Sequence, residues 1–380
     1  MTTLATEISP LALYEALNRG DSLALLDVRN EEEFKMGRVE GRHAAPGVNI
    51  PYFGFVDDEE AAVARIPFGK DERIVVVCAK GGSSDYVAQL LRERGYQAVN
   101  MVGGMLVWGD FYAVRDVVPP TSEFQLVQFN RPGKASLSYL VGSEGEALVV
   151  DANRVIEPYL DEARKRGLTI RHVLDTHVHA DYISGGSQLA RETGATYHIS
   201  GICGYQGDLK TDGQPGEIRV GSIVAQKIHT PGHTPGSTSL LVDGKYLLTG
   251  DTLFVESVGR PDLGGQAEPW AKQLYGTLFG TLKDLPDGTQ ILPSHYANAS
   301  ELRDDDLVVG DLGSIRRENE GMQAKSEEEF IEFIRANMRP SPEHYGKIRQ
   351  INMAVLSVCD GTLMELDLGK NECAASKGKG

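Results

Sequence analysis

Apolar side chains in the first part of the chain follow a helical spacing and then a strand spacing. Residues 11–17 repeat apolar positions at helical spacing behind Ser9 and Pro10, which form a favourable helix start. Residues 73–77 contain an uninterrupted β-branched run without the alternation of a half-exposed strand. Such a run is typical of a strand that is buried on both faces of its sheet. The pattern therefore predicts an N-terminal α/β domain with a buried central strand.

The second part of the chain shows two successive strand-rich patterns. A group of strand-like runs is followed by a helical pattern at 159–166 and a strand that ends at Thr176, and strands begin again near residue 218. The strand-like runs cover residues 124–129, 136–141, 146–151, 220–228, 239–243 and 245–248. This repetition predicts two sheets with helices on the outside, which is an αββα sandwich.

Two prolines mark the boundary between these two parts. Pro119 and Pro120 cannot extend a helix and they stiffen a connector. We therefore expect a first domain at residues 1–118, a linker at 119–122 and a second domain at 123–368. Residues 369–380 are mostly small or polar, which predicts a flexible tail.

Composition narrows the class of protein. The chain has 380 residues, of which 41% are hydrophobic, enough for two or three packed domains. Its net charge of −16 makes polyanions poor partners, so we expect no nucleic acid ligand. The apolar runs are strand-sized, which predicts no membrane span. The sequence shows no secretory leader, and its four cysteines lack disulfide-scaffold spacing, so we expect a cytoplasmic protein.

Four segments of the second domain carry candidate metal ligands at strand ends or tight turns. The first segment places three such side chains in alternate positions, which point to one side of the chain. Histidine and aspartate are standard ligands of divalent transition metals. The candidate ligands are His177, His179, Asp181, His233, Asp251 and His295. One His-x-His motif is a weak signal, but four segments in this order predict a metal centre in preference to buried structural polar groups.

A cysteine follows the buried strand of the first domain. Cys78 enters the loop Ala79-Lys80-Gly81-Gly82-Ser83-Ser84, and a helical pattern comes next. The two glycines permit backbone N–H groups to curl around the sulfur, and a helix N-terminus favours negative charge there. Both effects favour a reactive thiolate. The alternative is a buried structural cysteine, which would gain nothing from the two glycines.

Residues 5–117 resemble a rhodanese domain. The matching motifs are Leu26-Asp27-Val28-Arg29, residues 46–51, the Cys78 loop, and Val102-Gly103-Gly104 leading to Trp108. Rhodaneses carry sulfane sulfur on the loop cysteine as a persulfide and transfer it to a thiophilic acceptor. The resemblance implies catalytic roles for Cys78 and for Lys80, the only cation of the loop. Much of the family has arginine there, and lysine cannot make the bidentate contact of arginine with an anion.

Residues 123–355 resemble the persulfide dioxygenase branch of the metallo-β-lactamase fold superfamily. The resemblance is carried by the ligand segments together with residues 182–186, 229–237, 249–254 and 258–262. It implies that one iron(II) per chain is held by His177, His233 and Asp251, with positions left open for dioxygen and substrate.

The same resemblance bears on the residues around that iron. His179, Asp181 and His295 would either orient the ligands or coordinate additional metal. Tyr182 stands where the superfamily usually has a further histidine, which weakens a second metal site. Two further residues are expected to be catalytic. Arg260 stands at the family's Gly-Arg position, where it would bind a carboxylate of the substrate thiol, and a structural salt bridge is the alternative. Tyr296 directly follows His295, whereas the mitochondrial members of the family have an aspartate between this histidine and a tyrosine near the substrate, so Tyr296 departs from the pattern.

Together the two resemblances imply a bifunctional sulfur enzyme. The second domain would oxidise a low-molecular-weight thiol persulfide, such as glutathione persulfide, with O2 to sulfite and thiol. Cys78 would exchange sulfane sulfur among persulfide, sulfite and thiosulfate. One alternative is a glyoxalase II-type thioester hydrolase that uses zinc instead of iron, and another is a rhodanese domain that only carries or senses sulfur. The assembly state stays open, with a homodimer as the candidate.

Overall fold

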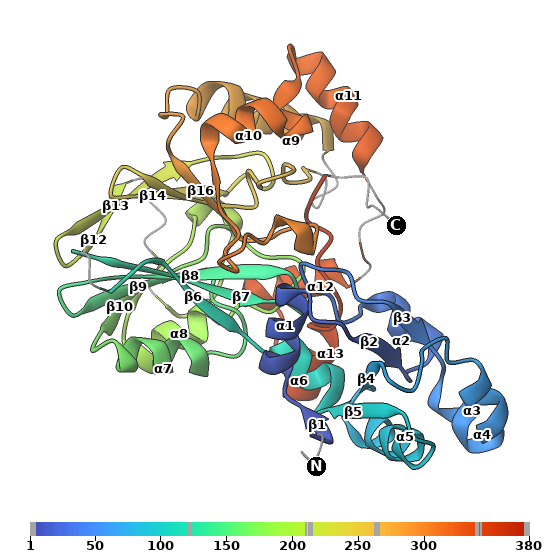
Figure 1. The fold of residues 1–380 in the computed structure, drawn as a ribbon. Helices are drawn as coiled ribbons and strands as arrows, with labels where there is room; N and C mark the ends of the chain where they lie inside the picture. The colour runs from blue at the N-terminus through green and yellow to red at the C-terminus, as the bar shows by residue number, and fades with distance from the viewer. Residues whose placement is uncertain are drawn as a thin grey trace. The chain divides into compact units, whose positions relative to one another are not determined.

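The computed structural model describes residues 5–120, 123–209, 211, 216–261, 267–338, 342 and 344–375 (Figure 1). The chain forms two compact units: residues 1–113 with 131–134 and 368–370, and residues 114–130 with 135–367 and 371–380. The division precedes the boundary predicted at residue 118. The reason is that β6 (Ala113–Val118) is the edge strand of a sheet in the second unit. Two residues of the predicted linker, 121 and 122, lie outside the described residues.

The first unit is a parallel sheet with helices packed against it. The sheet has the order β1-β5-β4-β2-β3, and each of its strand pairs is parallel. Its strands are β1 (Glu7–Ile8), β2 (Ala24–Asp27), β3 (Gly47–Asn49), β4 (Arg73–Val77) and β5 (Gln97–Met101). Its helices are α1 (Pro10–Arg19), α2 (Glu31–Met36), α3 (Tyr52–Asp57), α4 (Glu59–Ala64), α5 (Gly82–Glu93) and α6 (Gly104–Asp110).

Strand β4 is buried on both faces, as its β-branched run predicted. Ile74 and Val76 belong to an apolar cluster that includes side chains of α3, α4 and α5. Val75 and Val77 belong to a second cluster that includes side chains of α1 and α6. The strand is thereby fixed from two sides, and it holds the loop at its carboxyl end in a defined place.

The second unit contains two six-stranded sheets, ordered β11-β10-β9-β8-β7-β6 and β12-β13-β14-β15-β16-β17. The remaining strands of the first sheet are β7 (Gln125–Arg131), β8 (Ser136–Ser143), β9 (Glu146–Val150), β10 (Thr169–Leu174) and β11 (Thr196–His198). The strands of the second are β12 (Gly216–Val220), β13 (Ile223–His229), β14 (Thr238–Val242), β15 (Tyr246–Gly250), β16 (Gln290–Pro293) and β17 (Gly310–Asp311). The helices are α7 (Glu157–Lys165), α8 (Gly186–Thr193), α9 (Ala267–Gly276), α10 (Leu312–Glu318), α11 (Glu327–Asn337), α12 (Tyr345–Asn352) and α13 (Asp360–Leu366).

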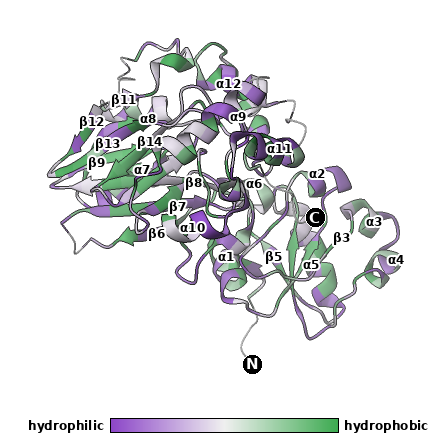
Figure 2. Ribbon diagram, turned by 90° about the horizontal axis from the view of Figure 1, so that it is seen from above, coloured by the Kyte–Doolittle hydropathy of each residue, from purple (hydrophilic) through white to green (hydrophobic). Residues whose placement is uncertain are grey.

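The two sheets pack face to face with helices outside. Apolar side chains of β8 and β9, such as Tyr139 and Val150, share one cluster with side chains of β14 and β15, such as Leu240 and Leu248. A second cluster joins the other face of β15 and β16 to α9, α10 and α11, while α7 and α8 contact β10. In Figure 2 the strands β9 and β14 show the green of hydrophobic residues. The architecture is the predicted αββα sandwich.

Part of the tail predicted at 369–380 forms backbone hydrogen bonds. The backbone of residues 373–375 runs beside residues 258–260: Ala374 forms a bridge with Gly259, and the N–H of Ala375 donates to Val258 O. Cys373 and Ala375 are fully buried as a result. The composition of the tail did not indicate these contacts, because they are made by backbone atoms and small side chains. Residues 376–380 lie outside the described residues.

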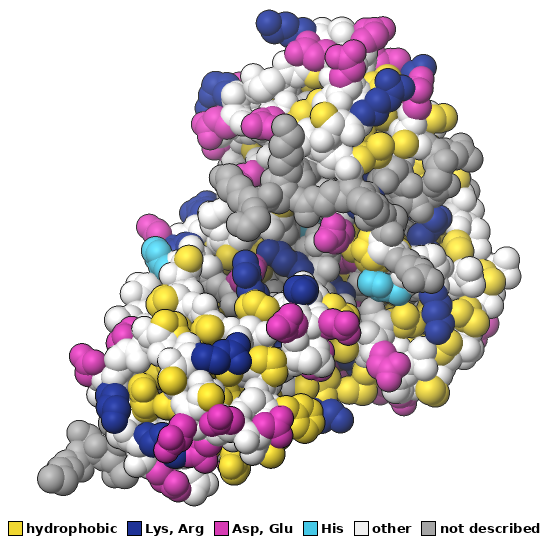
Figure 3. Space-filling view, turned by 90° about the vertical axis from the view of Figure 1, so that its right-hand side faces the viewer, with side chains coloured by type: hydrophobic (Ala, Val, Ile, Leu, Met, Phe, Trp, Pro, Cys, Tyr) yellow, Lys and Arg dark blue, Asp and Glu magenta, His cyan; other side chains and the backbone are white. Residues whose placement is uncertain are grey.

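The surface and the helices add two observations. None of the helices in the described ranges is long and apolar enough to cross a bilayer. Figure 3 shows acidic and basic side chains interspersed among the described residues of one face. Charges of both signs therefore offset one another on that face.

Candidate metal centre and cysteine loop

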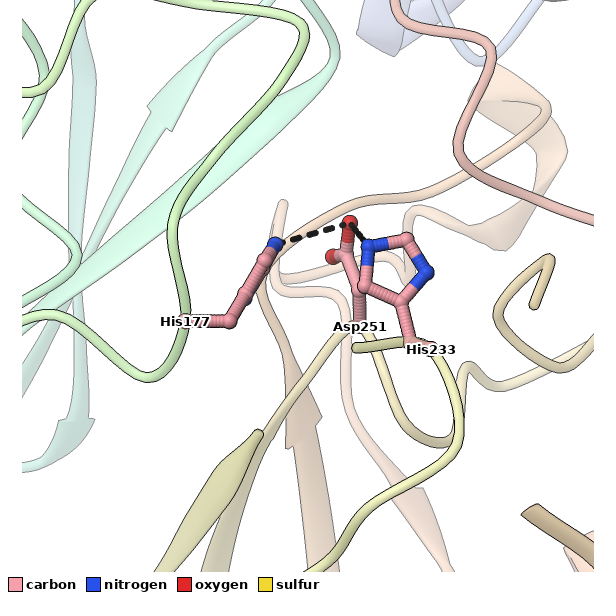
Figure 4. A group of neighbouring side chains, drawn as sticks. All are labelled: His177, His233 and Asp251. Carbon is pink, nitrogen blue, oxygen red and sulfur yellow. Dashed lines mark ion pairs between the residues drawn. The ribbon is translucent and has the colours of Figure 1, made fainter. Parts of the chain in front are cut away.

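Three predicted ligands from separate loops converge in the second unit. His177 follows β10 of the first sheet, while His233 follows β13 and Asp251 directly follows β15 of the second sheet. Nε2 of His177 lies 3.6 Å from Asp251 Oδ2, and Nε2 of His233 lies 3.5 Å from the same oxygen (Figure 4). The three side chains are buried and point toward a common centre.

The facing atoms of these side chains fit a metal ion. Nε2 of His177, Nε2 of His233 and Oδ2 of Asp251 are buried without a hydrogen-bond partner among the described residues. Buried polar atoms are costly unless they are paired or coordinate a metal. Ligand atoms at about 2.1 Å from one ion lie roughly 3.0–3.4 Å apart at octahedral or tetrahedral angles. The observed separations are close to this range, so a small contraction would complete the site.

Hydrogen bonds on the outer side of each imidazole set its orientation. Nδ1 of His177 lies 3.0 Å from Thr176 Oγ1, which donates to Asp151 Oδ2 at 2.9 Å. Nδ1 of His233 donates to the carbonyl oxygen of Arg260 at 2.8 Å. A histidine whose Nδ1 carries the proton presents the lone pair of Nε2 to a metal. Both rings are therefore held in the tautomer that a metal requires.

The electrostatics of the centre favour the ligand forms of the three residues. Burial lowers the pKa of His177 well below its ordinary value, and neighbouring histidines add to the shift. Burial also lowers the pKa of His233. Burial acts to raise the pKa of Asp251, but His295 and His233 together outweigh it and the pKa lies below its ordinary value. Two neutral imidazoles and one carboxylate are the protonation states in which these groups bind a cation.

His179 lies beside the centre and is tied into a separate hydrogen-bond network. Its ring centroid is 4.2 Å from that of His177, but its Nε2 lies 3.1 Å from Asp151 Oδ1 and 2.9 Å from the hydroxyl of Tyr182. Tyr182 also donates to the backbone carbonyl of Asp151 at 3.2 Å. Tyr182, at the position of the missing histidine, therefore serves to hold His179 and the loop in place.

Asp151 was missed by the sequence analysis and links much of this network. It follows β9 and accepts hydrogen bonds from the backbone and hydroxyl of Thr176 and from the hydroxyl of Ser294. The available signal was a carboxylate directly after the apolar run Ala147-Leu148-Val149-Val150, where an unpaired charge would be unfavourable. Its left-handed backbone, with φ of 56°, is a further mark of a constrained position.

Asp181 and His295 lie on the other side of Asp251. His295 Nδ1 is 2.6 Å from Asp251 Oδ1, and its Nε2 is 2.9 Å from Asp181 Oδ2. Burial opposes the charged form of His295, but the two carboxylates outweigh it and raise its pKa to about 10. The structure adds Cys373 to this group, a residue for which the sequence offered no motif.

The two residues expected to contact substrate are engaged within the protein. Arg260 is fully buried and its Nη1 donates to the carbonyl oxygen of Glu372 at 3.2 Å. Arg260 contacts the centre through its backbone carbonyl, which orients the ring of His233. The hydroxyl of Tyr296 donates to Asn130 Oδ1 at 3.1 Å. Substrate contact by either side chain stays a prediction.

The Cys78 loop in the first unit has the geometry that its glycines predicted. The Sγ of Cys78 accepts from the backbone N–H of Gly81 at 3.0 Å, and the Ser84 hydroxyl lies 3.1 Å from it. Gly81 adopts φ of 94°, which turns its N–H toward the sulfur at the start of α5. The Ser84 hydroxyl also donates to Asn100 Oδ1 at 2.7 Å, and Ser84 was not singled out by the sequence analysis. Lys80 is exposed.

Comparison with known proteins gives two family matches. The model of the rhodanese-like domain matches residues 9–110, and that of the metallo-beta-lactamase superfamily matches residues 131–202 and 205–295.

Three relatives of the second unit are informative. The mitochondrial persulfide dioxygenase ETHE1 of Mus musculus is 30% identical over 60% of this chain and 85% of its own length. The hydroxyacylglutathione hydrolase of Anaeromyxobacter dehalogenans is 30% identical over 58% of this chain and 82% of its own length. The crystal structure of ETHE1 from Myxococcus xanthus superimposes with a TM-score of 0.54 and 31% identity, covering 60% of this chain and 98% of that one.

Proposed function

Because the chain belongs to the metallo-β-lactamase superfamily and carries a rhodanese-like domain ahead of that fold, we propose that it is a persulfide dioxygenase with sulfurtransferase activity. The substrate would be a low-molecular-weight persulfide of the glutathione persulfide class. The reaction consumes one persulfide RSSH, one O2 and one water, and it yields the thiol RSH, sulfite and two protons. The terminal sulfur is oxidised and dioxygen is reduced.

One observation carries the proposal for the second unit. His177, His233 and Asp251 present two imidazole nitrogens and one carboxylate oxygen to the same centre. Two histidines and one carboxylate are the usual ligand set of non-haem iron oxygenases. An iron(II) ion held there supplies the redox chemistry between dioxygen and the terminal sulfur. The protein keeps both histidines neutral, keeps Asp251 anionic and fixes each ring from behind through Thr176 or the Arg260 carbonyl.

The cysteine loop supports the second activity. As a thiolate, Cys78 would attack the sulfane sulfur of thiosulfate, release sulfite and become a persulfide, which a thiol acceptor then takes up as RSSH. The N–H of Gly81 and the hydroxyl of Ser84 are placed to stabilise the anionic sulfur before and after transfer. The same steps in reverse consume a persulfide and sulfite and form thiosulfate.

A zinc-dependent thioester hydrolase is the second candidate. Relatives named hydroxyacylglutathione hydrolase match at the same level of identity, and the chain retains Asp181 and His295 beside Asp251. Hydrolases of this fold use a second metal. Tyr182 stands where one ligand of that metal would be, and this counts against the hydrolase.

The deciding experiment is oxygen consumption by anaerobically iron-loaded protein with freshly prepared glutathione persulfide. His233→Ala is the test variant, and His229→Ala is its control, since His229 ends the strand β13 that precedes the His233 loop, and its side chain is exposed and bonds to Pro235 O. We expect sulfite formation with oxygen uptake in the wild type and the control, and loss of both uptake and bound iron in His233→Ala. Absence of uptake together with thioester hydrolysis by zinc-loaded protein would establish the hydrolase instead.

A further inference from the structure

Helix α12 is docked on the ligand loop that follows β10. At the last residue of the helix, Nδ2 of Asn352 donates to the carbonyl oxygens of His179 at 2.9 Å and of Tyr182 at 2.8 Å. At its first residue, the hydroxyl of Tyr345 accepts from the backbone N–H of Glu372 at 2.8 Å. The side of α12 that carries Tyr345 and Asn352 therefore faces the ligand loop and the chain segment beside it.

Arg349 lies on the same side of this helix. Residues 345, 349 and 352 are four and three positions apart, so their side chains project from one face of α12. Arg349 thereby lies between the contact with Glu372 and the contact with the ligand loop. Its side chain is partly exposed, whereas Arg260 is fully buried. A partly exposed guanidinium at this place can meet a ligand that approaches from solvent.

The positive charge of Arg349 acts on the metal centre. Burial lowers the pKa of Arg349, because part of the guanidinium is withdrawn from water. The pKa of His177 is lowered by burial, by neighbouring histidines and also by the charge of Arg349. A cation beside a site for a divalent metal ion repels that ion, and a bound anion would relieve the repulsion. The position therefore favours an anionic ligand between Arg349 and the centre.

A carboxylate is the anion that fits this arrangement. A guanidinium presents parallel N–H donors that match the two oxygens of a carboxylate. A peptide-like thiol such as glutathione carries a carboxylate about one to two residue lengths from its sulfur, roughly 4–7 Å in an extended chain. A sulfur at the metal centre therefore leaves the carboxylate among the surrounding elements and not among the metal ligands. Arg349 occupies such a place.

We propose that Arg349 binds a carboxylate of the thiol carrier while the sulfur of that carrier lies at the metal centre. Arg349 is then a substrate-binding residue that selects carboxylate-bearing thiols over uncharged ones. It would supply the contact that the family position of Arg260 predicted. The inference rests on the proposed function for the class of thiol, which the dioxygenase and the hydrolase candidates share.

The test compares two persulfides in oxygen-uptake assays of wild type, Arg349→Gln and Lys347→Gln. Glutathione persulfide carries carboxylates, whereas the persulfide of 2-mercaptoethanol has none. Lys347 is the matched control, because it is an exposed cation on the same helix. In Arg349→Gln we expect kcat/KM for glutathione persulfide to fall about 10–100-fold, mainly through KM, because a charge-assisted hydrogen bond is lost. The kcat/KM for the mercaptoethanol persulfide should stay within about twofold of the wild type.

Calorimetric binding of glutathione to the same proteins gives a readout that needs no turnover. We expect a similar loss of affinity in Arg349→Gln and no loss in Lys347→Gln. Arg349→Lys keeps the charge without the planar fork, so its loss should be smaller, and it carries the test if circular dichroism shows that Arg349→Gln does not fold.

Two outcomes would overturn the proposal. One is an equal loss with both persulfides in a folded variant, which would show that Arg349 acts on the centre or on the helix and not on a carboxylate. The other is unchanged affinity for glutathione in the folded Arg349 variants. Absence of oxygen uptake by the wild type with either persulfide contradicts the dioxygenase, and the calorimetric comparison then still decides the role of Arg349.

Discussion

Replacing Thr176 by valine tests whether the hydrogen bond behind His177 determines metal binding. Valine has nearly the shape of threonine but lacks the hydroxyl that lies 3.0 Å from His177 Nδ1. Asp151 keeps donors in the variant, because the backbone N–H of Thr176 and the hydroxyl of Ser294 are unchanged. The loss therefore falls mainly on the imidazole of His177.

The magnitude follows from the buried position of that ring. His177 is 2% exposed, so its Nδ1–H would lose a partner that water does not replace, at a cost of about 1–3 kcal/mol. The ring can avoid this cost by moving its proton to Nε2, which removes the lone pair needed for the metal. Mutations of such orienting partners typically weaken metal binding about 10–100-fold. We expect a loss of iron(II) affinity in this range.

The assay is anaerobic competition for iron(II) between the protein and a coloured chelator. Thr176→Ser is the rescue variant, since it restores the hydroxyl and removes only a methyl group, and we expect nearly normal affinity for it. Circular dichroism of each metal-free protein controls for folding. If Thr176→Val folds normally and binds iron within twofold of the wild type, the orienting role of Thr176 is wrong.

Two further predictions concern the cysteine loop and the His295 pair. Ser84→Ala should lower the rate of sulfane sulfur transfer from thiosulfate about tenfold, because a hydrogen bond to a charged sulfur contributes about 1.5 kcal/mol or more. Ser83→Ala is the control, since the sulfur contacts among the described residues are Gly81 N and the Ser84 hydroxyl. Equal rates in the two variants would contradict the role of the Ser84 hydroxyl. The pKa of His295 is raised to about 10 by two carboxylates that outweigh its burial, so its contribution to stability is full below about pH 6.5 and is lost as pH rises through 10. The free energy of unfolding of metal-free protein, measured in urea, should fall over that interval more steeply in the wild type than in His295→Gln; parallel curves would show that His295 is not held as the cation.

The sequence predicted the parts of the fold and centre that have strong local signals. The unbroken β-branched run at 73–77 predicted a strand buried on both faces, and the structure shows it. The convergence of His177, His233 and Asp251 was accessible because each lies just beyond a strand, and strand ends in packed sheets lie close together.

Other parts depended on contacts between distant residues. The sequence shows Asp151 only as the residue that ends a buried strand. The three-dimensional arrangement reveals that the hydroxyls of Thr176 and Ser294 donate hydrogen bonds to it. Cys373 lay in a stretch of small and polar residues, and its burial comes from backbone pairing with residues 258–260. Pattern reasoning reads periodicity along the chain and has no access to such pairing.

The origin of the metal ligands from both sheets has a consequence for the biosynthesis of the protein. His177 belongs to the first half of the sandwich, whereas His233 and Asp251 belong to the second. No unfolded or half-synthesised chain holds the three groups together, so metal can be captured only after both halves have folded and docked. Once captured, the ion clamps one half to the other and adds its binding free energy to the native state. Metal supply during expression should therefore govern how much of the chain survives proteolysis, independently of any turnover.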